Sequence, residues 1–458
     1  MKTKQILAVI LGAMFICSCS DVLDNALGDE VIIEKDYSIP MEDALASLEN
    51  FMIDAGRLPE TKGGLTEYIK DSFTVSGLAT KSGENYEDVL YVINFVDDGG
   101  YALLSADSRI QEDIIAITDS GSASEADFNE PVYDRIPSEN DDLSVSEFDE
   151  MVESGVLAEE QSQVNYECLL YAMGQIETNQ DDVIEIGSPC DPGPGGGGGT
   201  GGAPITYQWE IVKEVPRMLN TAWTQRTINN DIFNKYCPEV GLIWRTKAPA
   251  GCVCIATAQI IAYHEYPANL TCDGVQIDYP EIKRIYSYDE YNGTGTETSQ
   301  EMLARFCKTV GVFCNTQYHS IFNKPWGFAW PWDAKSCLEM FGYQNVSLNW
   351  GYDESRILTS LNNGYPVFMS ALRELWTGHA WVVDGYIMRN YVSSNGVVDK
   401  SQTLVHCNWG WHGVCNGYFT SGIFKTDEVV LPDNLSSEQR YRNYNMAINT
   451  ITYDITHE

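Results

Sequence analysis

Apolar positions in the first 180 residues follow a helical pattern, then a strand pattern, then a helical one again. Residues 41–52 carry apolar side chains at helical spacing, which predicts an amphipathic helix. Three apolar runs predict strands, at 89–96, 101–105 and 114–117. The turn Asp97-Asp98-Gly99-Gly100 joins the first two as a hairpin. Since residues 145–178 again have a helical pattern, this region is expected to fold as a small α+β unit.

A second helical pattern begins at Cys252. Gly251 permits a sharp backbone turn, and apolar residues then recur at helical spacing as Ala256, Ile260 and Tyr263. This predicts a buried helix with Cys252 in its first turn, where unpaired N–H groups and the helix dipole favour a thiolate. The alternative is that Cys252 is a small apolar core residue.

A candidate base follows in the last third of the chain. Residues 377–386 predict a buried strand with His379 at its entrance, and residues 403–411 predict a second strand that contains Asn408. Cys, His and Asn in this order are typical of nucleophilic catalysis in which the His takes the thiol proton and a third group orients the ring. A single His is more often structural, but the three segments together favour catalysis.

These segments carry a resemblance to a known family. The first is Gly251-Cys252-Val253, followed by Ala256-Thr257-Ala258-Gln259-Ile260. The others are Gly378-His379-Ala380 with Val383-Asp384-Gly385, and His406-x-Asn408-Trp409-Gly410-Trp411-x-Gly413. Because several specific motifs recur in the right order, the chain resembles the streptopain family of papain-like cysteine peptidases.

The resemblance implies a role for each matching residue. Cys252 would be the nucleophile and His379 the general base and acid. Asn408 would orient the histidine, and Trp409 would shield it from water. A weaker match at Trp223-Thr224-Gln225 implies that Gln225 helps to bind the oxyanion.

The sequence departs from the family pattern at three positions. Cys254 and Ile255 replace small residues, which we expect to repack the helix, and His412 replaces a glycine, which we expect to alter the rim of the cleft. None of these changes removes a predicted catalytic group.

Charge divides the chain into two halves. Residues 21–192 contain 41 Asp and Glu but 7 Lys and Arg, whereas residues 193–458 contain 25 and 19. All 11 Trp and all 6 His follow residue 200. The glycine-rich stretch at 193–204 predicts a flexible linker between the halves. We therefore expect an acidic propeptide domain at 19–192 and a peptidase domain at 205–458, each with its own core.

The first residues predict export. Lys2 and Lys4 precede an apolar run, 6–16, that has the length of a signal-peptide core. Residues 16–19 resemble a lipoprotein box, so residues 1–18 are predicted to be the signal and Cys19 the lipidated residue. An ordinary signal peptide is the alternative. Contact with a membrane is expected only through this lipid anchor.

Thirteen cysteines in an exported chain invite disulfides, and ten remain after Cys17, Cys19 and Cys252 are set aside. Their connectivity does not follow from their spacing. A zinc site at 406–415 is disfavoured because no pair of Cys-x2-Cys motifs occurs. No metal, cofactor or nucleic-acid partner is expected, since phosphate loops and basic patches are absent from the sequence.

We therefore predict an exported cysteine endopeptidase that is made as a self-inhibited zymogen. Its fold would be α+β: a papain-like domain, with a helical and an antiparallel-sheet subdomain, preceded by a small α+β propeptide domain. The partners would be protein or peptide substrates and its own propeptide. The alternatives are a catalytically idle peptide-binding lipoprotein and a Cys-His amidase acting on cell-wall peptides.

Overall fold

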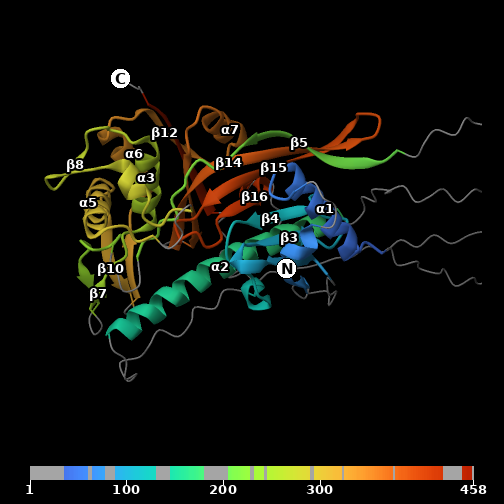
Figure 1. Ribbon diagram of the computed structural model, residues 1–458, viewed down its shortest axis with the longest axis horizontal. Coiled ribbons are helices and arrows are strands. Elements are labelled where there is room, and N and C mark those ends of the chain that lie inside the picture. Colours follow the sequence, from blue (N-terminus) through green and yellow to red (C-terminus); the bar gives the residue numbers. More distant parts are fainter. Residues whose placement is uncertain are drawn as a thin grey trace, which may run out of the picture. The chain divides into compact units, whose positions relative to one another are not determined.

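One antiparallel sheet joins strands from both ends of the chain. The computed structural model describes residues 36–59, 64–77, 88–129, 145–179, 205–226, 232–241, 245–288, 293–321, 324–374, 377–425 and 446–455. The strands of the sheet are β1 (Ile69–Val75), β2 (Leu90–Phe95), β3 (Tyr101–Ser105), β4 (Ile114–Thr118), β5 (Tyr207–Val215), β12 (Gln344–Trp350), β13 (Val367–Glu374), β14 (Thr377–Ser393), β15 (Val398–Asn408), β16 (Gly417–Thr420) and β17 (Met446–Asp454). They pair in the order β1-β2-β3-β4-β16-β15-β14-β13-β17-β12, and β5 pairs with β14 (Figure 1).

The helices lie around this sheet and at one end of it. They are α1 (Met41–Asp54), α2 (Val145–Thr178), α3 (Cys252–His264), α4 (Tyr279–Lys283), α5 (Glu297–Phe313), α6 (Pro331–Met340) and α7 (Glu354–Asn362). Three short hairpins accompany them: β6 (Glu239–Val240) with β7 (Thr246–Lys247), β8 (Thr271–Cys272) with β9 (Val275–Gln276), and β10 (Gln317–Ile321) with β11 (Lys324–Phe328). Helices α3, α5 and α6 gather at one end of the view in Figure 1.

The α+β prediction is confirmed, and several predicted elements appear where the apolar pattern placed them. Helix α1 covers the predicted helix at 41–52, and β2 and β3 form the predicted hairpin. Strand β4 corresponds to the run at 114–117, and α2 coincides with the predicted helix at 145–178. The helix that begins at Cys252 is α3, whose residues from Val253 to Ala262 are all buried.

The expectation that each half buries its own core holds for one apolar cluster of the C-terminal half, which is confined to residues 219–455, and fails for the rest of the core. One apolar cluster contains Leu90 and Leu103 from the N-terminal half together with Trp381, Trp409 and Phe419 from the C-terminal half. A second cluster likewise combines residues of α1 with residues of β14, β15 and β16. The physical reason is the pairing of β4 with β16, which makes the two sheets continuous, so that the side chains on each face pack across the junction.

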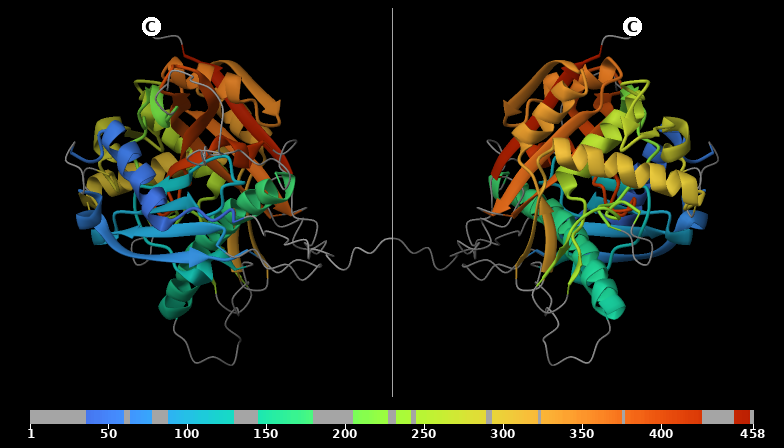
Figure 2. Two further views of the ribbon diagram at one scale, coloured as in Figure 1. Left: turned by 90° about the vertical axis from the view of Figure 1, so that its right-hand side faces the viewer. Right: turned by 90° about the vertical axis from the view of Figure 1, so that its left-hand side faces the viewer.

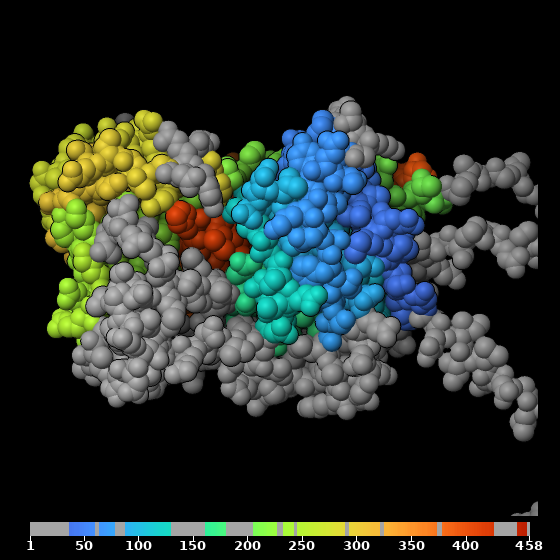
Figure 3. All heavy atoms as spheres, turned by 60° about the horizontal axis from the view of Figure 1, so that its bottom comes forward, coloured from blue at the N-terminus to red at the C-terminus, as the bar shows by residue number. Residues whose placement is uncertain are grey.

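The junction brings the two halves side by side over the folded part of the chain. Residues 37–458 form one compact unit, and the linker predicted at 193–204 lies outside the described residues. In Figure 2 the N-terminal strands (blue) lie next to the C-terminal strands (orange and red). The space-filling view of Figure 3 shows a red patch of the C-terminal half between the yellow helical part and the blue and cyan N-terminal strands. None of the helices in the described ranges is long and apolar enough to cross a bilayer.

Candidate active site

Cys252 occupies the first position of α3, as the sequence predicts. Gly251 precedes it with a φ of 94°, and a Cβ at this position would lie 3.0 Å from the carbonyl oxygen of Gly327. Both the backbone angle and the close approach therefore require glycine. The thiol is half-buried at the N-terminus of the helix, where the helix dipole favours a negative charge.

His379 lies on β14 and lines the same cavity as Cys252. The cavity has a volume of about 100 Å³, and His379 is 4% exposed. Most of the remaining wall is apolar or aromatic, contributed among others by Val253, Phe328, Trp330, Trp332, Trp350, Ala371 and Leu372. The structure thus brings the two residues with the strongest sequence signal together between the helical part and the sheet.

The ring of His379 is oriented by a backbone carbonyl. Its Nε2 lies 2.7 Å from the carbonyl oxygen of Trp409. Because a carbonyl oxygen only accepts hydrogen bonds, Nε2 carries the proton, and in the neutral ring Nδ1 is the basic nitrogen. A neighbour that fixes the tautomer in this way leaves the opposite nitrogen suited to take a proton from a thiol.

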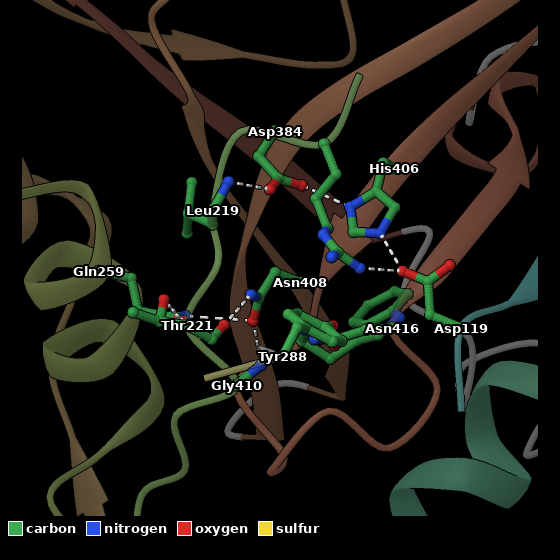
Figure 4. A network of polar contacts seen from close by, with 12 residues as sticks. Asp119, Leu219, Thr221, Gln259, Tyr288, Asp384, His406, Asn408, Gly410 and Asn416 are labelled. Atoms are coloured by element: carbon green, nitrogen blue, oxygen red, sulfur yellow. Dashed lines mark hydrogen bonds and ion pairs between the residues drawn. The ribbon is translucent and has the colours of Figure 1, made fainter. Parts of the chain in front are cut away.

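Asn408 does not make the predicted contact with His379. Its amide group donates to the carbonyl of Thr221 at 2.8 Å, and its oxygen accepts from the side chain of Gln259 and the N–H of Gly410, both at 3.2 Å (Figure 4). Gln259 lies two turns after Cys252 on α3. Asn408 therefore links the cysteine helix to the end of β15, and the carbonyl of its neighbour Trp409 reaches the histidine.

Trp409 is buried near the histidine, and two further tryptophans share that position. The ring centroid of Trp409 lies 6.2 Å from that of His379, whereas Trp411 lies at 4.5 Å and Trp381 at 6.1 Å with an interplanar angle of 7°. The sequence patterns assign no role to Trp411, which lies in the motif of Asn408 and Trp409, or to Trp381. Trp411 could have been predicted from its spacing, because it lies two residues after Trp409, with Gly410 between them.

Gln225 lies beside the segment that enters α3. Its backbone carbonyl accepts a hydrogen bond of 2.8 Å from the N–H of Ala250, two residues before Cys252. The preceding residue, Thr224, forms an isolated bridge with Trp411 on the other side of the site. The segment is thus held next to both Cys252 and His379, and the oxyanion role of the Gln225 side chain stays a prediction.

The described cysteines are not joined by disulfides, although the sequence invites such bonds. The free thiols are Cys168, Cys237, Cys252, Cys254, Cys272, Cys307, Cys314, Cys337, Cys407 and Cys415. Burial raises the pKa of the Cys254 thiol well above its usual value, and neighbouring thiols add to this effect. Cys254 is therefore held as a neutral thiol two residues from the half-buried Cys252. Cys19 and the predicted signal at 1–18 lie outside the described residues.

The other histidines of the motifs have partners elsewhere. His264 packs at the end of α3, with its Nε2 3.1 Å from the hydroxyl of Tyr453. His412 lies edge-on against Tyr286, and burial lowers its pKa. His406 is fully buried, with Nδ1 facing Asp384 and Nε2 facing Asp119. Both ring nitrogens of His406 are thus engaged by carboxylates, away from the cavity of Cys252 and His379.

The predicted rim effect of His412 is not seen in the cavity itself. The residues that line the cavity lie between 252 and 449 and do not include His412. The described part of the N-terminal half contributes none of them. It instead contacts the loop that follows Trp411, where the hydroxyl of Ser120 donates to the carbonyl of Gly413 at 2.7 Å.

Comparisons with known proteins point to one family. Residues 223–419 match the model of the Peptidase C10 family. Streptopain of Streptococcus pyogenes serotype M28 is 27% identical over 201 residues, and streptopain of serotype M1 is 28% identical over 198 residues. Each match covers 38% of this chain and 45% of the relative, so the chain spans less than half the length of these curated relatives.

A solved structure also resembles the chain over most of its length. It is a fragment of prointerpain A from Prevotella intermedia, with a TM-score of 0.46 and 18% sequence identity. The match covers 83% of this chain and 97% of the fragment.

Proposed function

We propose that the protein is a cysteine endopeptidase made as a self-inhibited zymogen, since residues 223–419 match the model of the Peptidase C10 family. The observation that carries this proposal is the shared cavity of Cys252 and His379. The thiol lies at a helix N-terminus, and the hydrogen bond to Trp409 orients the imidazole. These are the two groups that thiolate catalysis needs.

The reaction follows from these positions. His379 Nδ1 takes the proton of Cys252, and the thiolate attacks the peptide carbonyl carbon. The backbone N–H of Cys252 and the side chain of Gln225 stabilise the oxyanion of the tetrahedral intermediate. His379 then protonates the leaving amine, the C–N bond breaks, and a thioester remains on Cys252. A water molecule, deprotonated by His379, hydrolyses the thioester and restores the thiol.

The hydrogen bond to Trp409 keeps the ring of His379 in place through both proton transfers. The imidazolium formed after the first transfer is stabilised by this carbonyl and by the ring of Trp411, whose centroid lies 4.5 Å from that of His379. Asn408 acts one step further away, because it fixes the backbone around Trp409 and Gly410 and ties it to α3 through Gln259. We therefore assign Asn408 a positioning role.

The wall of the cavity favours an apolar side chain of the substrate. Trp330, Pro331 and Trp332 come from the start of α6, and Ala371, Leu372 and Ala447 come from strands β13 and β17. A volume of about 100 Å³ next to Cys252 suits an aliphatic side chain better than a charged one, because a buried unpaired charge is costly.

The N-terminal half acts as the propeptide in this proposal, and the chain is exported. The match of residues 223–419 to the Peptidase C10 family model supports a cysteine peptidase zymogen. We propose cleavage between Ile186 and Tyr207, a signal at residues 1–18 and lipidation at Cys19, in keeping with the apolar run and lipoprotein box of the sequence.

One experiment separates this function from the idle-protein and amidase alternatives. The purified chain, after its linker has been cut, is incubated with a denatured protein mixture, and the released peptides are identified by mass spectrometry. We expect internal cleavages that disappear with Cys252→Ala and persist with Cys254→Ala. Cleavage of cell-wall peptides alone, with the proteins left intact, would favour the amidase.

Activation is tested on the same variants without an added protease. The wild-type chain should be converted to a fragment that starts near residue 200, whereas Cys252→Ala should accumulate at full length. Full hydrolysis of large substrates by an uncut wild-type chain would contradict an inhibitory propeptide.

A further inference from the structure

Strand β4 connects the two halves through few backbone pairs. It pairs with β16 at three positions: Thr118 with Gly417, Ile117 with Tyr418, and Ala116 with Phe419. The N–H of Asp119 extends this ladder by a 2.7 Å hydrogen bond to the carbonyl of Asn416. Three pairs are too few to hold a strand in water unaided, so other contacts must contribute.

Glycine at position 417 allows the close approach of β4. A Cβ there would lie 2.3 Å from the carbonyl oxygen of Ile117 and 2.5 Å from the Cα of Thr118. The three atoms nearest to such a Cβ all belong to β4. The edge of β16 is therefore shaped to receive another backbone at short range.

A carboxylate stands at each end of β4, and each meets cations of the C-terminal half. Asp113, just before the strand, pairs with Arg389, whose side chain is 1% exposed. Asp119, just after it, lies 3.0 Å from Nε2 of His406 (Figure 4). It also lies 2.8 Å from the guanidinium of Arg217.

Both cationic ends are built into the C-terminal half. Arg389 is fixed by a 2.7 Å hydrogen bond to Gln402, whose amide also donates to the carbonyl of Ile114 on β4. His406 is held by Asp384 through Nδ1, and Arg217 lies over the ring of Tyr288 at 3.7 Å. Removal of β4 would leave these cations without Asp113 and Asp119, at a high cost in free energy for groups that are largely buried.

We propose that the edge of β16, with Arg389 at one end and His406 and Arg217 at the other, is a binding surface for an extended segment with a carboxylate at each end. Its occupant is the segment 113–119 of this chain, and it stays bound after the linker has been cut. Main-chain pairing supplies part of the affinity, and the two carboxylates fix the register. Release of the propeptide thus needs a second event besides cleavage.

This inference takes one assumption from the proposed zymogen, namely that the linker is cut. Its test does not depend on peptidase activity. The full chain carries Cys252→Ala, which prevents self-cleavage, and a recognition site for a site-specific protease inserted in the stretch 193–204. After cutting, gel filtration measures how much N-terminal fragment elutes with the C-terminal fragment, and exchange with labelled fragment gives its dissociation rate.

We expect the cut parent to stay associated at pH 6. Asp113→Asn and Asp119→Asn should each raise the dissociation rate at least about tenfold, since loss of one partner from a buried charge pair acts mainly on dissociation. The matched control is Asp98→Asn, which removes the same charge from the exposed turn between β2 and β3 and should change nothing. Melting of the uncut variants checks that each one folds.

A competing peptide tests the same contact without a substitution at the junction. Excess synthetic peptide with the sequence of residues 111–121 should displace the labelled N-terminal fragment from the cut parent. The same peptide with both aspartates replaced by asparagine should do so at least about tenfold less well.

Two results would overturn the proposal. One is immediate separation of the cut parent at pH 6. The other is a double Asp113→Asn and Asp119→Asn variant that dissociates no faster than Asp98→Asn. Either result would leave the peptidase assignment standing, because that assignment depends on turnover by the wild-type chain.

Discussion

The cleft and the junction between the halves are built in opposite ways. The cleft places two polar reactive groups, Cys252 and His379, within an apolar and aromatic wall. The junction instead concentrates charge, with Asp113 and Asp119 inserted against Arg389, Arg217 and His406. The contrast implies that activity in the cleft depends on the identity of single side chains. The association of the two halves at the junction depends instead on charge and therefore on pH.

The two regions meet at one loop. Trp411 lies against the ring of His379, and two residues later the carbonyl of Gly413 accepts a hydrogen bond from Ser120 of the N-terminal half. The carbonyl of Asn416 likewise accepts from the N–H of Asp119. Departure of the N-terminal half would therefore remove two hydrogen bonds from the loop that carries Trp411, whose ring lies against His379.

The largest effect should come from the cleft. His379→Ala removes the group that moves protons in both steps, and we expect kcat/KM on a protein substrate to fall about 10,000-fold. His412→Ala serves as the control, because His412 is packed against Tyr286 and does not line the cavity. If His412 instead proves indispensable, the assignment of the second half of the site is wrong.

The junction should respond to pH with a smaller effect. The carboxylates of Asp384 and Asp119 outweigh burial and raise the pKa of His406 to about 9, so its contribution to stability is complete below about pH 6.5 and is lost as the pH rises through 9. His406 and Arg57 are the main causes of the lowered pKa of Asp119, so that contribution is present above about pH 3.9 and is lost only well below it. Groups facing this pair also include Arg217, Tyr288 and Tyr418.

Thermal unfolding of the uncut Cys252→Ala chain checks this dependence. We expect the contribution of this pair to stability to be constant between about pH 4 and 6.5 and to fall by about 3 kcal/mol toward pH 9.5, with a smaller fall in Asp119→Asn because one of the two carboxylates is gone. Identical pH profiles for the parent and Asp119→Asn would show that the pair does not contribute.

Substrate choice should change activity less again. The apolar wall of the cavity predicts that peptides with an aliphatic side chain near the cut bond are hydrolysed at least about tenfold faster than peptides with an acidic one at that position. A series of fluorogenic peptides that differ at one position at a time measures this ratio. Equal rates throughout the series would mean that the cavity does not receive a substrate side chain.

The smallest effect on turnover should follow from Asn408→Ala. Asn408 is fully buried and bonds with Thr221, Gln259 and Gly410, so its loss should lower the free energy of unfolding by about 1–3 kcal/mol. Turnover should fall by about tenfold or less, with an unchanged pH–rate profile, because the ring of His379 is held by the Trp409 carbonyl. A shifted pH–rate profile would restore the direct role that the sequence suggested.

Local signals in the sequence predicted most of the candidate site. The glycine before Cys252, the apolar period after it and the glycine before His379 each describe one element and the residue at its end. Trp409 was assigned through its side chain, whereas its carbonyl is the group that contacts His379. Every residue has a backbone carbonyl with the same chemistry. The sequence therefore could not show that the carbonyl of Trp409, and not the side chain of Asn408, contacts His379.

The junction could not be predicted because its partners are far apart in the sequence. Asp119 and His406 are separated by 287 positions. Because the N-terminal half contains so many acidic residues, nothing in the sequence distinguishes the two that pair with buried cations. The pairing of β4 with β16 is equally non-local. The division of charge near residue 193 suggested two separate cores, whereas a shared sheet requires side chains of both halves to pack together.

The central claim is that Cys252 is the nucleophile and His379 its base. The most direct measurement is labelling with a thiol-directed epoxide at mildly acidic pH, followed by mass spectrometry of the modified peptide, on the wild-type chain with its linker cut and on His379→Ala. We expect the label on Cys252 of the wild-type chain and its near-complete loss in His379→Ala. Labelling chiefly at Cys254, or equal labelling of Cys252 in both chains, would contradict the claim.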